Sequence, residues 1–154
     1  MIRLVIPKLE DLWFREKLIG NEETMAYNKK WSGTIDFPQN KREDWYARWV
    51  ACPENKRFYR YILNEDNVFV GETAYHFDES RQIYVTGILV MAKYRGKGYG
   101  SAGLSLLCDC AKQNGIECLY DDIAIDNPSV SLFLKQGFLE EYQTSDFIMV
   151  KKVL

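Results

Sequence analysis

The segment best suited to chemistry runs from Arg95 to Gly100 and places three glycines and two basic side chains within six residues. It follows the apolar run Ile88–Met91 and opens directly into a segment with helical periodicity. The first turn of a helix leaves backbone N–H groups without partners, and the helix dipole adds roughly half a positive charge there. Glycines let a phosphate approach the backbone closely. The sequence therefore predicts an anion-binding cradle at this turn.

Three other interpretations of the segment are weaker. Gly98-x-Gly100-x-x-Gly103 matches the dinucleotide pattern GxGxxG, but a basic run separates it from the preceding strand and the chain has only one βαβ unit. Gly96-Lys97-Gly98 is not a P-loop, because the lysine is not followed by Ser or Thr. A plain glycine-rich connector with solvated basic side chains is also conceivable. Three glycines at the start of a helix would then weaken folding without any gain.

Two motifs in the chain resemble those of the GNAT family of N-acetyltransferases. Its acyl-CoA pyrophosphate motif, R/Q-x-x-G-x-G/A, stands here as Arg95-x-x-Gly98-x-Gly100 within the stretch 90–101. A second family feature, an Asn-containing turn and a short helix ending in Gly-Phe, is matched by Asp126-Asn127-Pro128 and by Gly137-Phe138. The order of elements agrees with the family from residue 2 to residue 151, so the resemblance covers nearly the whole chain.

The resemblance implies both a fold and a donor. The expected fold is a mixed α/β sheet that splays open, with the pantetheine arm of acetyl-CoA between the strand ending at Met91 and the strand 118–125. Acetyl-CoA is expected as co-substrate, and its acetyl group would pass to a primary amine by direct attack in a ternary complex. The residues expected to contact the donor are Leu89, Val90, Met91, Arg95, Gly96, Lys97, Gly98, Tyr99, Gly100, Ser101, Asn127 and Phe133.

The chain departs from the family at the position of the usual proton donor. Many members carry a Tyr four residues before the Gly of Gly-Phe, where its hydroxyl protonates the departing thiolate, and Phe133 stands there in this chain. The usual Asn falls on Asp126 rather than on Asn127 by the same count. The thiolate is therefore expected to leave as an anion, through water, or with help from another group.

Two residues are candidates for the base that takes a proton from the acceptor. An alkyl ammonium has a pKa near 10 and must lose a proton before it attacks. Glu72 is the first candidate, because strand alternation predicts that it shares a face with Val70, Ala74 and His76. A turn over 78–81 would place it opposite Gly87. His76 is the second candidate, because it alone titrates near neutrality without a perturbed pKa. Each also has an ordinary structural interpretation.

The acceptor itself is not identified by the sequence. Asp121-Asp122 and Glu22-Glu23 are acidic enough to attract a cationic amine, and the loop 21–40 is expected to set specificity. A non-catalytic acyl-CoA-binding sensor is the alternative function, and Phe133 favours it slightly.

The elements needed to position these residues follow from periodicity and turn signals. We expect strands at 2–6, 57–63, 68–77, 82–91, 118–125, 138–142 and 147–151, and helices at 9–19, 41–51, 98–114 and 128–136. The order is β-α-α-β-β-β-α-β-α-β-β, a mixed sheet with helices on its faces. No repeat or linker divides the chain, so residues 1–154 are expected to form a single domain.

The bulk composition narrows the functional classes. The chain has 154 residues, 47% hydrophobic and 27% charged, as in a globular protein. A net charge of -2 gives no bias toward nucleic acid or anionic membranes. The four cysteines form no CxxC pair and have His76 as their only histidine companion, so no metal site is expected. The sequence predicts a cytoplasmic protein, and monomer and homodimer both stay open.

Overall fold

The computed structural model describes residues 1–31 and 33–154, with side chains described for all of these except 29–31. The strands are β1 (Arg3–Val5), β2 (Arg57–Leu63), β3 (Phe69–Asp78), β4 (Ile83–Val90), β5 (Cys118–Ala124), β6 (Leu139–Gln143) and β7 (Phe147–Val153). The α-helices are α1 (Leu12–Ile19), α2 (Arg42–Trp49), α3 (Tyr99–Gln113) and α4 (Ser129–Lys135). Short 3₁₀ segments are η1 (Leu9–Asp11), η2 (Ala26–Trp31), η3 (Gln39–Lys41) and η4 (Ala92–Tyr94). The predicted element order and mixed α/β class are confirmed.

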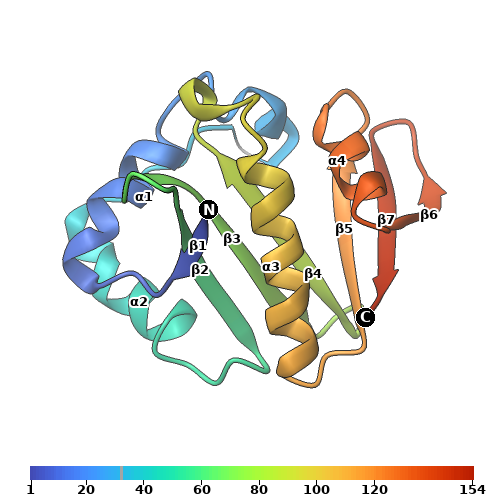
Figure 1. The fold of residues 1–154 in the computed structure, drawn as a ribbon, viewed down its shortest axis with the longest axis horizontal. Helices are drawn as coiled ribbons and strands as arrows, with labels where there is room; N and C mark the ends of the chain where they lie inside the picture. The colour runs from blue at the N-terminus through green and yellow to red at the C-terminus, as the bar shows by residue number, and fades with distance from the viewer. Residues whose placement is uncertain (32) are drawn as a thin grey trace.

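The seven strands form one sheet in the order β1-β2-β3-β4-β5-β7-β6. All neighbours are antiparallel except β4 and β5, which are parallel. Helices α1 and α2 pack at the β1–β2 side of the sheet, whereas α3 crosses the face of β3 and β4, and α4 lies beside β5 (Figure 1).

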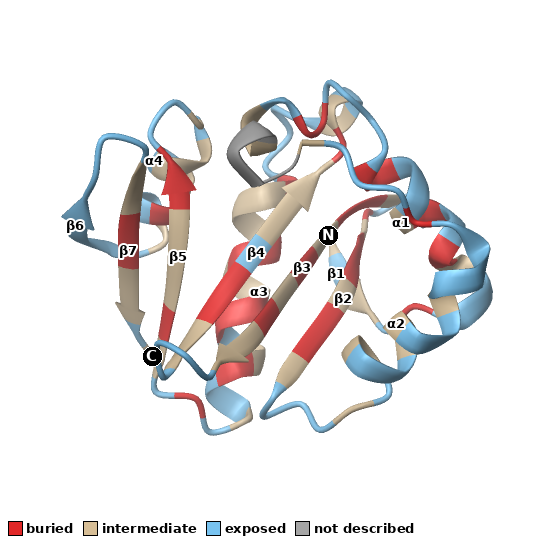
Figure 2. Cartoon of the chain, turned by 180° about the vertical axis from the view of Figure 1, so that it is seen from behind, coloured by how far each residue is buried: buried red, intermediate tan, exposed pale blue. Residues whose placement is uncertain are grey.

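Helix α3 is held on the sheet by the apolar stripe that its periodicity predicts. Leu104, Leu107, Cys108 and Ala111 are all buried, in one core with Tyr75 of β3 and residues of β5 and α4. Gly115, at φ +81, ends the helix in the left-handed conformation that glycine adopts easily. A second core, built by α1 and α2, covers the other face (Figure 2). The two cores hold the strands that carry the site.

Strands β4 and β5 touch at a fork. Their ladder has a single registered pair, Val85 with Tyr120, although each strand continues for several residues beyond it. Beyond this pair the strands diverge toward the end of the molecule that carries α4 and the start of α3 (Figures 1 and 2). The sheet is thus opened where the sequence predicts the donor's arm.

The predicted register of the β3–β4 hairpin is wrong by two residues. Asp78 pairs with Ile83, so the turn occupies 79–82 and Glu72 lies opposite Leu89 rather than opposite Gly87. The turn is shifted because Gln82 adopts a left-handed φ of 58° and because the Asp78 side chain accepts bonds from the Ser80 and Arg81 amides. Gly87 lies opposite Ala74 instead.

The prediction that Glu72 shares a face with Val70 is also wrong. Leu63 pairs with Phe69 and Ile62 with Gly71, so Val70 is an extra residue in a β-bulge. Val70 packs with Ile62 and Tyr99 on the α3 face, whereas Glu72 contacts Arg15 of α1 on the opposite face. A bulge reverses the alternation of side chains along its strand.

Candidate active site

A cavity of about 690 Å³ opens where β4 and β5 diverge. Its walls come from β4, β5, the start of α3, α4 and the loop after α1. Among the lining residues are Thr24, Tyr27, Asn28, His76, Arg81, Thr86, Leu89, Val90, Arg95, Gly96, Gly98, Tyr99, Gly100, Ser101, Asp121, Asp122, Asn127 and Phe133. Ten of the twelve residues predicted to bind the donor are brought together here.

The glycine-rich turn has the backbone that an anion cradle requires. Gly96 and Gly98 have φ of +79° and +83°, a conformation that residues with a side chain seldom adopt. A Cβ at either position would meet nothing within 4 Å, so the backbone faces open space. No side chain caps the start of α3, which leaves the first N–H groups of the helix available to a ligand.

Gly100 serves a different purpose from the other two glycines. A Cβ there would lie 2.9 Å from Leu132 Cδ1 of α4 and 3.6 Å from Val90 Cγ2. The missing side chain lets α3 and α4 approach each other beside β4, so Gly100 fixes the width of the cavity.

Arg95 ties the cradle to the loop after α1. Its Nη2 donates to the Thr24 carbonyl at 2.7 Å, and the Thr24 hydroxyl accepts the Ala92 amide at 2.9 Å. Two predicted residues lie elsewhere: Met91 is buried in the α1–α2 core, and Lys97 lines a separate surface cavity near Glu65.

Asn127 and Phe133 frame the α4 side. The Asn127 Oδ1 accepts the Ser129 amide at 2.9 Å and so orders the start of α4. Phe133 packs edge-to-face on Phe138, with ring centroids 4.9 Å apart, and is almost fully buried.

His76 lines the cavity and has an ordered ring. The imidazole meets Trp49 edge-to-face at 5.5 Å between centroids. Burial lowers the pKa of His76, with a smaller opposing effect from Asp78, so the ring is neutral at neutral pH and able to accept a proton.

Glu72 does not line this cavity, and it belongs to a buried ionic cluster. Arg15 Nη1 lies 2.6 Å from its Oε2, which also accepts a hydrogen bond from the Tyr59 hydroxyl. The Arg15 guanidinium stacks 4.4 Å from the centre of the Trp45 ring. Burial and the negative charge of Glu72 raise the pKa of Tyr59. The carboxylate thus joins α1 and α2 to the sheet.

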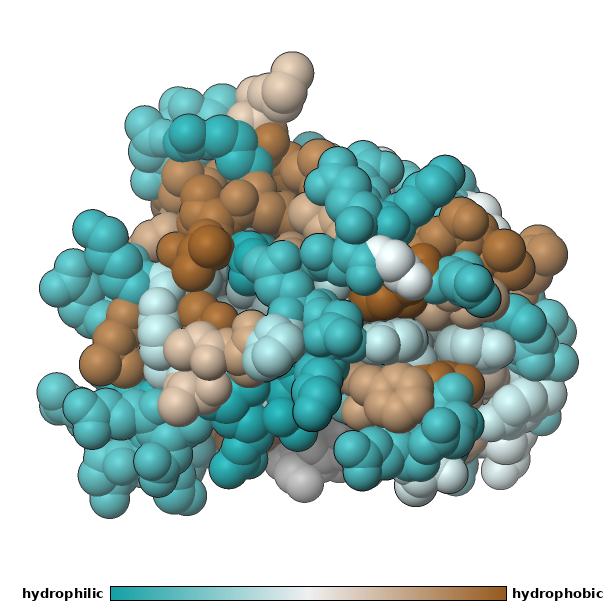
Figure 3. All heavy atoms as spheres, turned by 90° about the horizontal axis from the view of Figure 1, so that it is seen from below, coloured by the Kyte–Doolittle hydropathy of each residue, from teal (hydrophilic) through white to brown (hydrophobic). Residues whose placement is uncertain are grey.

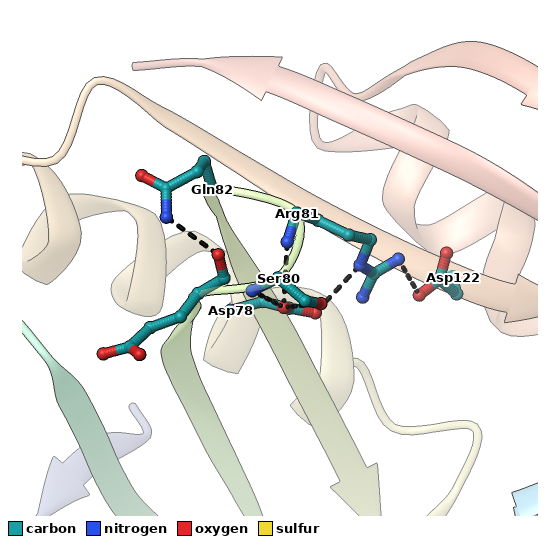
Figure 4. Close-up of polar contacts among 6 residues, drawn as sticks. Asp78, Ser80, Arg81, Gln82 and Asp122 are labelled. Carbon is teal, nitrogen blue, oxygen red and sulfur yellow. Dashed lines mark hydrogen bonds and ion pairs between the residues drawn. The ribbon is translucent and has the colours of Figure 1, made fainter.

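The fork end of the cavity is acidic and is braced by the β3–β4 turn (Figure 4). Arg81 donates from Nε to Asp78 at 2.8 Å and from Nη1 to Asp122 at 2.9 Å. Asp78 also accepts the amide and hydroxyl of Ser80, so the turn holds the guanidinium in place. The two carboxylates around Arg81 outnumber the one cation.

Comparison with known proteins places the chain in a family. The sequence profile described as "Acetyltransferase (GNAT) family" matches residues 21–138. The chain belongs to the GNAT family. A search of curated proteins found no match.

Solved structures with this GNAT fold share little sequence with the chain. A spermidine N-acetyltransferase from Vibrio cholerae, solved in complex with CoA and spermine, is 18% identical with a TM-score of 0.81, covering 99% of this chain and 95% of that one. An acetyltransferase from Salmonella typhimurium with acetyl-CoA is 18% identical, with a TM-score of 0.77 and coverage of 100% and 94%. An N-acetyltransferase from Staphylococcus aureus is 21% identical, with a TM-score of 0.76 and coverage of 99% and 97%. These likenesses confirm the GNAT fold over the whole chain.

Several cavity residues of this GNAT domain were not singled out from the sequence. Thr24 had no local signal, because its role depends on contacts with residues about 70 positions later. Arg81 looked like an ordinary turn residue, and Thr86 an ordinary strand residue. Loop 21–40, which we expect to set acceptor specificity, contributes Thr24, Tyr27 and Asn28 to the cavity wall.

In the described part of the chain, no helix is long and apolar enough to cross a membrane. The same residues hold no cluster of three or more His, Cys, Asp or Glu arranged for a metal ion.

Proposed function

We propose that this protein is an N-acetyltransferase that moves the acetyl group of acetyl-CoA to a primary amine. The observation that carries the proposal is one continuous cavity with opposite charge at its two ends. Arg95 and the uncapped start of α3 make one end positive, while Asp122, which shares Arg81 with Asp78, makes the other end acidic.

The positive end suits the donor. Backbone N–H groups at Gly98–Ser101 would bind the pyrophosphate, and the left-handed glycines leave room for it. The parted edges of β4 and β5 would flank the pantetheine arm. Acetyl-CoA therefore fits the residues present.

The acidic end suits a cationic acceptor. Asp78 and Asp122 share the single cation Arg81, so the local charge is negative and an ammonium group would be attracted. The structure of the Vibrio cholerae relative contains spermine, a polycationic amine, which supports the same class of acceptor here.

His76 is our first candidate for the base, and Glu72 our second. The neutral His76 imidazole borders the cavity on the face that carries Asp122, and it would take a proton from the bound ammonium. Glu72 would need to leave Arg15 and Tyr59 to do the same. The free cysteines suit a reducing compartment, and we propose a cytoplasmic location on that ground.

The alternative is an acyl-CoA sensor without turnover, favoured by the absence of a hydroxyl at Phe133. Thiol release from acetyl-CoA, measured with a panel of monoamines, polyamines, amino acids and peptides, separates the two. We expect release that depends on a cationic amine, with the amide product confirmed by mass spectrometry. His76→Gln should lower kcat roughly 100-fold or more with an unchanged Kd for acetyl-CoA. Tight binding of acetyl-CoA with no turnover on any amine would favour the sensor.

A further inference from the structure

The proposed chemistry needs a donor for one further proton. When the thioester breaks, the thiolate of CoA leaves, and a proton donor near the sulfur makes it a better leaving group. Phe133 occupies the α4 position that faces the cavity, and its ring has no hydroxyl. The ring is also 1% exposed and packs edge-to-face on Phe138.

Asp121 stands on the same side of the sheet as Phe133. Leu119 and Ile123, two residues before and after it, pack in the core with Phe133 and α3. Strand alternation therefore turns Asp121 toward α3 and α4, and turns Asp122 toward Arg81 on the opposite face.

The Asp121 carboxyl group lies just beyond the point where β4 and β5 part. Val85 and Tyr120 form the last registered pair between β4 and β5, and Thr86 and Asp121 are the next residue on each strand. Both line the cavity. An arm inserted between the diverging strands would thus end near this carboxyl group.

The surroundings of Asp121 favour its protonated form. Burial, and then the neighbouring charge of Asp122, raise its pKa well above the usual value for aspartate. Thr86 from β4 and Arg81 from the turn act in the opposite direction with smaller effects. Its β7 partner Val150 is apolar, as are the α3 and α4 side chains of this core, namely Leu104, Leu107 and Phe133. The site thus favours the neutral carboxylic acid over the carboxylate, and the neutral form is the one that can donate a proton.

We propose that Asp121 is a catalytic residue that protonates the departing thiolate, in place of a hydroxyl on α4. The proposal rests on the acetyltransferase function above. The amine, already relieved of one proton by the base, forms its C–N bond to the acetyl carbonyl carbon. The C–S bond then breaks, and the sulfur takes the proton of the Asp121 carboxyl group. The proton that the new amide nitrogen loses returns to the Asp121 carboxylate, so the residue is restored each cycle.

The test compares the wild-type protein with Asp121→Asn in steady-state thiol release across pH. In the wild type, kcat should fall on the alkaline side as Asp121 loses its proton, because only the protonated form donates. Asp121→Asn should lower kcat about 100-fold or more and remove this alkaline fall, while the Kd for acetyl-CoA by calorimetry stays within about 2-fold. Asp109→Asn, the same change on the exposed face of α3, is the matched control and should match the wild type.

The possible outcomes separate the two proposals. Amine-dependent turnover that is undiminished in Asp121→Asn would overturn the role of Asp121 while leaving the acetyltransferase function intact. If no amine supports turnover, the proposed acetyltransferase function is wrong. The slow hydrolysis of acetyl-CoA then tests Asp121, because attack by water releases the same CoA thiolate. Equal hydrolysis rates in wild type and Asp121→Asn would overturn the inference. Thermal melting and acetyl-CoA binding show whether Asp121→Asn is folded. If it is not, Asp121→Glu, which keeps the carboxyl group, replaces it in the test. Its kcat should still fall at alkaline pH if the inference holds, and a kcat without this fall would overturn the inference.

Discussion

Two acidic side chains on opposite faces of the sheet show how surroundings decide the role of a carboxyl group. Glu72 is joined to a guanidinium and a phenol, so its negative charge is balanced where it lies. Asp121 is partly buried beside an acidic neighbour, and these surroundings raise its pKa. The sequence presents both as strand residues, and only the packing of α1 and α3 distinguishes the ion-paired Glu72 from Asp121, our proposed proton donor.

The Glu72 cluster leads to a prediction at the scale of a single residue. Glu72→Gln should destabilise the protein by about 3 kcal/mol, because the Arg15 cation would stay mostly buried without its anion. Urea unfolding followed by fluorescence of the tryptophans measures this loss.

A matched variant tests whether burial is the cause. Glu16→Gln breaks the pair with Arg42, but the Glu16 side chain is 52% exposed, so the loss should stay below about 1 kcal/mol. Equal losses in both variants would contradict the structural role. A large drop in turnover by folded Glu72→Gln would instead make Glu72 the base.

At the scale of elements, the sequence predicts nearly all the helices and strands but not the register between them. The ends of β2 and the body of α3 agree with prediction, because alternation and helical periodicity are local properties. The sequence does not predict the β3–β4 register or the Val70 bulge. One left-handed residue in a turn, or one extra residue in a strand, changes every later residue pair between the two strands. The cradle is predictable for the same reason as α3: all its parts lie within one short segment. The contacts of Glu72 and Thr24 cross 57 and 68 positions and have no local signal.

The glycine cradle gives a prediction about the start of α3. Gly98→Ala should lose about 1 kcal/mol of stability, because its φ of +83° is strained for alanine. It should also weaken acetyl-CoA binding at least 10-fold, since strain and the new methyl group disturb the N–H groups facing the donor. Calorimetric titration with acetyl-CoA measures the second effect.

Gly115→Ala separates strain from binding. Gly115 has a φ of +81°, and an added methyl group would meet nothing within 4 Å, as at Gly98, but it lies at the opposite end of α3. The same loss of stability is expected with unchanged affinity. If Gly98→Ala bound acetyl-CoA as tightly as Gly115→Ala, the cradle would not be the donor site.

At the scale of the whole molecule, the sheet consists of two parts joined narrowly. One part is β1–β4 and the other is β5, β7 and β6, and the strand ladder between them has one registered pair. The Arg81–Asp122 ion pair adds a second link at the end of the molecule that carries the β3–β4 turn, where hydrophilic residues cover much of the surface (Figure 3). A donor bound between the parts would therefore contact both and stabilise their arrangement.

Acetyl-CoA should accordingly raise the melting temperature and protect particular amides. At 100 times Kd the ligand adds about 2.7 kcal/mol, which corresponds to a rise of roughly 5–10 °C for a chain of this size. Hydrogen exchange should slow most at Tyr99, Gly100 and Ser101, whose N–H groups precede the first complete helical turn of α3. Exchange at Val85 and Tyr120, already paired at the fork, should change little. Protection confined to the β3–β4 turn would contradict this geometry, because the donor would then lie at the acidic end and not between the two parts of the sheet.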